Sequence, residues 1–155
     1  MREVIKEDVL DVQEEAGVLE SLYVSLQLGN RETAMHHLQL SEEHYLAEKW
    51  DDSIANCRKF LECVLGEVAV AHSLRVKGSP LPETTYTRPV RVRDYLEREG
   101  LLEKKEKEVL AEVYGLLSQT GGHPYKAQSE QAQLLRGFAL SFSHFTMRRF
   151  SDRLV

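Results

Sequence analysis

Apolar residues separated alternately by three and four positions recur through most of the chain, and this spacing restricts the fold more than any other feature. The first such series is Val9, Val12, Ala16, Leu19, Tyr23 and Leu26. Residues at this spacing lie along one side of an α-helix, so each series predicts an amphipathic helix. No alternation of apolar and polar residues is long enough for a useful β-strand. The sequence therefore predicts an all-α fold.

The helical series and their breaks divide the chain into segments of one expected domain. We expect an acidic N-terminal helix in residues 1–29, a helix pair in 30–76, a loop at 77–90 and C-terminal helices in 91–155. Gly29 and Gly100 are natural helix ends, and the prolines of the loop oppose helix formation. Because 155 residues fit one domain with a substantial core, we expect an up-and-down bundle of four main helices with short additional helices.

The charge of the chain limits its classes of function. A formal net charge of −5 argues against a protein that coats nucleic acid over its whole surface. One segment is nevertheless basic, because residues 75–93 contain a single acidic residue, Glu83. The candidate nucleic-acid-binding residues there are Arg75, Lys77, Arg88, Arg91 and Arg93. Solvated faces of helices and a loop explain the same charges, so both interpretations stay open.

Two further features indicate the cellular compartment in which we expect the protein. Cys57 and Cys63 lie six positions apart in one helical pattern, so their side chains diverge, and we expect two small buried thiols in a reducing environment. The first residues show no signal-peptide pattern, and no window is apolar enough to cross a bilayer. We therefore expect a cytoplasmic protein that does not associate with membranes.

A polar break at residues 118–125 carries the leading candidate for a functional side chain, His123. It precedes the last helical series, and imidazole titrates near neutral pH, as a catalytic proton carrier requires. The helix expected to begin at Asp51 or Asp52 is apolar around most of its circumference, so we expect it to be the central helix. Arg58 and Glu62 lie one turn apart on the same side of it. A structural interpretation is that Ser118 and His123 hydrogen-bond to this pair, forming a polar core network that fixes the break against the bundle.

Together, the Arg58–Glu62 helix and the break with His123 resemble the small all-helical domains called HEPN, which include C-terminal domains of bacterial abortive-infection proteins. The resemblance extends over roughly residues 31–153. It implies a metal-independent RNA cleavage in which the histidine transfers a proton and an arginine neutralises the phosphate. It also implies a homodimer, because HEPN sites are commonly assembled across two subunits, and it implies no cofactor.

The chain departs from the HEPN pattern at the arginine that should stand shortly before the histidine. Leu116, Leu117 and Ser118 occupy those positions. Without that cation, the charge of a cleavage transition state needs stabilisation from elsewhere, such as Arg58, Arg136 or a second subunit. We therefore expect a catalytically degenerate HEPN-like module of a prokaryotic stress or defence system that binds RNA or a protein.

Two other functions stay open. The first is a metal-independent endoribonuclease in which His123 belongs to a composite site in a homodimer. The last helix carries Phe138, Phe142, Phe145 and Phe150, which fit either a dimer seam or an ordinary core stripe. The second is a helical adaptor with no nucleic-acid role, which binds a protein partner through its acidic first helix or its proline-containing loop.

Two weaker patterns lie on the second predicted helix. Arg31 followed by His36 or His37 matches the HEPN spacing, but the family places its motif before the last helix, so we interpret this match as chance. His37 and His44 share a helix face with Glu48. These histidines are two turns, about 10 Å, apart, which is too far for one zinc ion without ligands from another element. The sequence predicts no metal site.

Overall fold

The computed structural model describes residues 2–120 and 128–154, and describes side chains within 14–118 and 128–154. These residues form seven α-helices and no strand, so the all-α prediction is confirmed for this part of the chain. The candidate His123 lies outside the described residues.

Five of the helices have 16 residues or more, one long helix beyond the four that we expected. They are α1 (Arg2–Ser25), α2 (Arg31–Leu46), α3 (Trp50–Val76), α6 (Lys104–Thr120) and α7 (Ser129–Arg153). Two shorter helices, α4 (Glu83–Tyr86) and α5 (Pro89–Arg98), lie between α3 and α6 in the chain. Within the ranges given above, none of the helices has the length and apolar character needed to span a bilayer.

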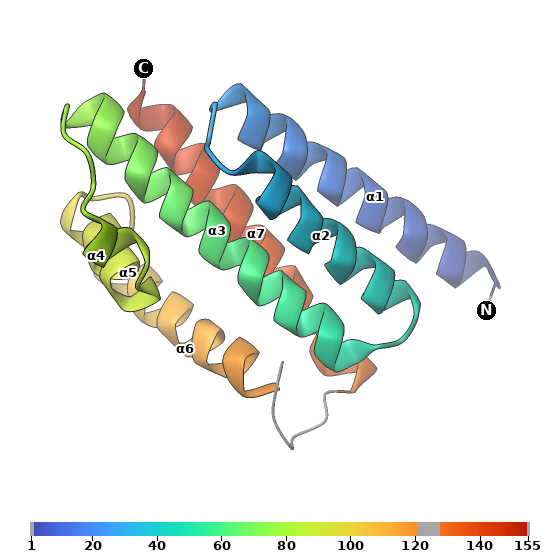
Figure 1. The fold of residues 1–155 in the computed structure, drawn as a ribbon. Coiled ribbons are helices and arrows are strands. Elements are labelled where there is room, and N and C mark those ends of the chain that lie inside the picture. The colour runs from blue at the N-terminus through green and yellow to red at the C-terminus, as the bar shows by residue number, and fades with distance from the viewer. Residues whose placement is uncertain (1, 121–127, 155) are drawn as a thin grey trace.

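Helix α3 lies at the centre of the bundle (Figure 1). It packs against α2 and α7 most extensively and against α5 and α6 on a further side, while α1 packs on α2 and α7. Its buried residues surround the helix axis and include Ile54, Phe60, Leu61, Val64 and Val68, all without exposed surface. A helix that is apolar around most of its circumference requires neighbours on every side, which explains the position of α3.

The turn between α1 and α2 fixes one wall of the bundle close to α3. Helix α1 ends at Ser25, and Gly29 follows within the connection. A Cβ atom at Gly29 would lie 2.7 Å from Oε1 of Glu67, so a larger residue would displace that side chain. Asn30 donates from its side chain to the same carboxylate at 3.3–3.4 Å. The start of α2 is therefore attached directly to α3.

The segment expected to be a loop, residues 77–90, contains the one-turn helix α4, so the expectation of irregular structure is wrong there. Pro82 precedes this turn, where a missing N–H costs no helical hydrogen bond. Pro89 similarly occupies the first turn of α5. Helix α5 ends as expected near Gly100, which has φ of 77°, and the N–H of Leu101 donates to the carbonyl of Leu96 at 2.8 Å. The side of α5 that faces the bundle carries Val92, Tyr95 and Leu96, which are all buried.

Candidate functional site

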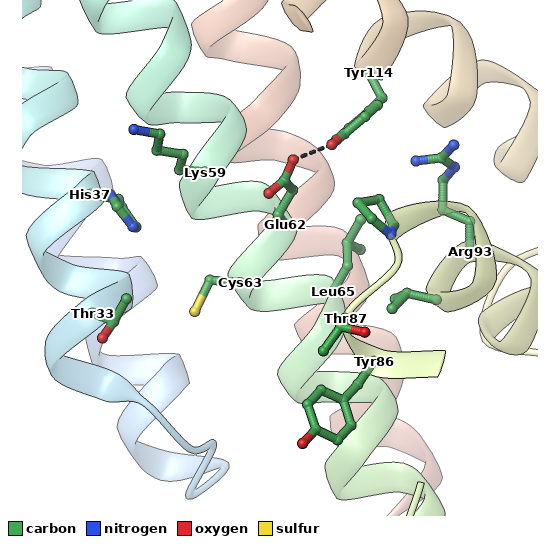
Figure 2. Close-up of a pocket in the computed structure, with 12 residues that line it drawn as sticks. Thr33, His37, Lys59, Glu62, Cys63, Leu65, Tyr86, Thr87, Arg93 and Tyr114 are labelled. Carbon is green, nitrogen blue, oxygen red and sulfur yellow. Dashed lines mark hydrogen bonds between the residues drawn. The ribbon is translucent and has the colours of Figure 1, made fainter. Parts of the chain in front are cut away.

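A cavity of about 260 Å³ lies where α2, α3, α5, α6 and the α4–α5 connection meet (Figure 2). Its polar lining includes His37 from α2, Lys59 and Glu62 from α3, Arg93 from α5 and Tyr114 from α6. The central helix α3 therefore supplies the floor, and three other helices bring polar groups to it.

The pair that the sequence places on the central helix is formed as an ion pair at the edge of this cavity. Nη1 of Arg58 lies 2.9 Å from Oε1 of Glu62, and both side chains are about 30% exposed. The hydroxyl of Tyr114 donates to the same carboxylate oxygen (Figure 2). Burial and the neighbouring carboxylate raise the pKa of Tyr114, so the phenol remains a donor at neutral pH. The negative charge of Glu62 is thus largely compensated within the chain.

Ser118, which we expected in this network, lies one turn after Tyr114 on α6. Within the described residues its hydroxyl makes no hydrogen bond to Arg58 or Glu62, and the acceptor Glu62 is instead reached by the phenol. A tyrosine spans a gap between two helices that a serine cannot bridge. In the sequence Tyr114 resembles an ordinary apolar member of its helical series, so nothing distinguishes it as a polar partner.

Arg93 is the most unusual side chain in the cavity, because it is only 8% exposed and lacks a carboxylate partner among the described residues. Its guanidinium carbon lies 4.8 Å from the ring centroid of Tyr114, a cation–π contact. Its Nη1 atom is buried and has no hydrogen-bond partner in the described part of the chain. Arg93 is buried because successive helical residues are rotated by about 100°, which places it at the edge of the face formed by Val92 and Leu96.

His37 lies in the same cavity, although we interpreted its sequence pattern as chance. Burial is the largest effect on the pKa of His37 and lowers it, although the side chain of Asn56 and, more weakly, Glu62 act in the opposite direction. The nearby Lys59 contributes to the lowering. The imidazole is therefore mostly neutral at pH 7. The helix that carries His37 packs on α3 beside Lys59 and Glu62, a proximity that the spacing of residues along one helix does not reveal.

The five basic residues of the predicted nucleic-acid surface do not form one strip. Arg75 donates to two carbonyl oxygens that follow α1, and Lys77 lies 3.1 Å from a carboxylate at the end of α5. Arg88 and Arg91 are exposed, whereas Arg93 is buried in the cavity. Because Arg91 and Arg93 are about 200° apart around α5, they project from different sides of the helix.

The described His, Cys, Asp and Glu side chains bear on metal and thiol chemistry. In the part of the chain that the structure describes, no three His, Cys, Asp or Glu side chains come close enough to hold a metal ion. Cys57 is buried and Cys63 half-buried, and both are free thiols. Cys63 lines the cavity, but burial raises its pKa, so the thiol is protonated and a weak nucleophile at neutral pH.

The cavity thus combines a buried guanidinium whose Nη1 has no hydrogen-bond partner among the described residues, an exposed lysine and a largely neutral histidine around a compensated glutamate. This set is suited to hold an anion. Comparisons of the chain with protein-family models, with curated proteins and with solved structures found no match.

Proposed function

We propose that the chain is a HEPN-like, catalytically degenerate helical module that binds RNA, and that the cavity on α3 contacts the phosphate backbone. The observation that supports this proposal is the pair of cations, Lys59 and Arg93, that lie on either side of Glu62 (Figure 2). The carboxylate of Glu62 already bonds to Arg58 and Tyr114. The positive charge of the other two side chains therefore remains available to a ligand.

Physical arguments favour an anion at this place. A guanidinium presents a planar fork that matches two phosphate oxygens, and its attraction to them is stronger in a partly dehydrated cavity than in water. Because Lys59 and Arg93 flank Glu62, an extended polyanion can contact both cations more easily than one small phosphate. Tyr86 also lines the cavity and is 44% exposed, so its ring is available to stack on a base. This aromatic ring favours RNA over an acidic peptide.

The proposal is tested by the affinity of the purified chain for a labelled, mixed-sequence single-stranded RNA, measured by fluorescence anisotropy over a range of salt concentrations. The cavity variant is Lys59→Gln with Arg93→Gln. The control, Arg88→Gln with Arg91→Gln, removes the same charge from exposed positions. We expect the cavity variant to lose about tenfold or more in affinity and to reduce the salt slope by about 1.4, whereas the control retains affinity within about threefold.

Each other outcome has a definite meaning. Equal losses in both variants would indicate diffuse attraction to basic surface, and a loss confined to the control would move the site to the exposed arginines. Competition by a poly-glutamate peptide at the same charge concentration would identify an acidic protein as the ligand. The absence of RNA binding by the unmodified chain would overturn the proposal.

Catalytic degeneracy is tested with the same RNA incubated in excess chelator. We expect the RNA to stay intact with the unmodified chain and with His123→Ala. Chelator-resistant cleavage that disappears in His123→Ala would instead establish the metal-independent endoribonuclease.

A further inference from the structure

A buried histidine on α3 contacts two other helices near the end of the bundle. The side chain of His72 is 5% exposed, and its ring lies between Tyr95 of α5 and Phe150 of α7. Its Nδ1 atom is 2.9 Å from the hydroxyl oxygen of Tyr95, and the centroids of these two rings are 5.8 Å apart. Phe150, one of the phenylalanines that fit either a dimer seam or a core stripe, is fully buried here. These three side chains, which we call the His72 cluster, therefore join α3, α5 and α7.

The charged groups around the His72 cluster are mostly cations, and they come from all three helices or their ends. The positive side chains are Arg75 and Lys77 at the end of α3, Arg98 of α5 and Arg153 of α7. Glu99, directly after α5, is the acid that acts on His72 in the described chain. Its carboxylate is already 3.1 Å from Nζ of Lys77. A positive charge on His72 would therefore have no free counter-ion among these groups.

The surroundings of His72 favour its neutral form. Burial is the largest effect on the pKa of His72 and lowers it, Glu99 opposes this effect, and Lys77 and Arg153 contribute to the lowering. A neutral imidazole thus fits the closed cluster, whereas a protonated imidazole is more stable in water. Helix α5 has only 10 residues, whereas α7 has 25 and packs extensively on α3. Of these two neighbours of His72, α5 is therefore the one that separates more easily.

We propose that the contact between His72 and Tyr95 is an acid-sensitive latch that controls how often α5 separates from α3. Neutral His72 keeps α5 closed, and uptake of a proton from solvent by His72 favours the open state. The contribution of neutral His72 to the closed state is fully present above about pH 6.5 and is lost as the pH falls below that value. Because α5 also carries Arg93, each opening withdraws Arg93 from the cavity.

The effect of the latch is graded. One proton changes an equilibrium by at most about tenfold per pH unit, so a helix that opens rarely at pH 7.5 stays closed in most molecules at pH 5.5. Acid therefore changes the frequency of opening over this range and leaves the average structure of the cavity almost unchanged. The inference holds whether or not the chain binds RNA.

The test is amide hydrogen exchange of the full chain at pH 7.5 and 5.5, measured by mass spectrometry and corrected for the intrinsic dependence of exchange on pH. We expect α5 amides to be less protected than α3 amides at both pH values, which marks a local opening. The protection of α5 should fall by about fivefold from pH 7.5 to 5.5. In His72→Gln, which keeps a polar side chain without the titrating group, the protection of α5 should differ by less than about twofold between the two pH values. The control is His144→Gln, which removes an exposed histidine of α7 and should retain the fall.

Three outcomes would overturn the proposal. Equal protection of α5 and α3 would mean that α5 opens only when the whole fold does. A fall in protection that persists in His72→Gln would assign the acid sensitivity to another group. The third outcome needs no variant, because the imidazole of His72 can be titrated by NMR in the unmodified chain. We expect a midpoint below the ordinary value of 6.5, and a midpoint at or above it would exclude the latch.

Discussion

The cavity and a hollow between α6 and α7, lined by residues that include Val109 and Phe138 and called here the α6–α7 groove, share helix α6. They depart from the usual partition of side chains in opposite ways. In the cavity, the charged Arg93 is only 8% exposed and has a buried nitrogen without a partner in the described chain. At the groove, the apolar Val109 and Phe138 are 49% and 38% exposed. Burial of an unpaired polar group is unfavourable, and so is exposure of a continuous apolar patch. Neither arrangement stabilises an isolated chain, so each suggests a ligand of matching chemistry.

The largest expected effect distinguishes a buried from an exposed position of α6 with one pair of identical substitutions. Val113 is 8% exposed and Val109 is 49% exposed, and they are one turn apart on this helix. Val113→Ser should lower the free energy of unfolding by about 2 kcal/mol, because a buried methyl pair is replaced by a hydroxyl without a partner. Val109→Ser should change it by less than about 0.5 kcal/mol, since serine and valine have similar helix propensities. Urea denaturation of the purified variants at low protein concentration measures both free energies of unfolding.

Equal losses in the two valine variants would show that the side chain of Val109 is as well covered as that of Val113. The groove would then be part of the core and not an exposed apolar surface.

An intermediate effect is expected when the buried charge of the cavity is removed. Arg93→Met retains much of the side-chain volume but eliminates the unpartnered donor, whose desolvation costs about 1–3 kcal/mol. Loss of the cation–π contact with Tyr114 offsets part of this gain. We therefore expect the free energy of unfolding to rise by about 1 kcal/mol while RNA affinity falls. Chemical denaturation and anisotropy titrations of the same sample provide the two measurements.

A fall of 1 kcal/mol or more in Arg93→Met would identify the arginine as a structural group of the fold. Its role as a contact for phosphate would then need independent support from a charge-preserving variant, Arg93→Lys.

The smallest expected effect concerns pH. Burial lowers the pKa of His37 below its ordinary value of 6.5, so the unfolded chain takes up a proton before the folded chain does. The contribution of neutral His37 to stability is present above about pH 6.5 and is lost as the pH falls through and below that value. Bound phosphate favours the protonated imidazole, so RNA affinity should rise by about threefold as the pH falls from 8 to 5.5.

His37→Gln is the matched variant for this comparison, because it removes the titrating group while keeping a polar side chain in the cavity. Its RNA affinity should lose most of the pH dependence between 8 and 5.5. Burial also lowers the pKa of His72, which lies outside the cavity. The dependence of RNA affinity on pH must therefore be compared between the unmodified chain and His37→Gln. Identical curves for the unmodified chain and the variant would remove His37 from the proposed site.

Much of the candidate site was visible in the sequence as separate elements, but its assembly was not. The spacing of Arg58 and Glu62 predicts a contact within one helix, and this contact is formed at 2.9 Å. From the sequence we grouped Arg93 with the exposed basic residues, although its position between Val92 and Leu96 is a local sign of burial. Tyr114 gave no such sign, because a tyrosine in an apolar helical series is usual in a core. The polar role of Ser118 depended on a loop conformation, which no helical periodicity predicts.

By itself, the sequence determined the longer helices, because the spacing of apolar residues and the end signals at Gly100 and Pro89 act over a few positions of the chain. It did not predict the one-turn helix α4. It also determined that α3 is central, since only that series is apolar on most sides. Tertiary structure decided that Tyr114 bonds to Glu62, that His37 faces Lys59, and that Arg93 enters the cavity. These contacts depend on how far each helix is shifted and rotated against α3. That offset results from the packing of the whole core and the lengths of the connections.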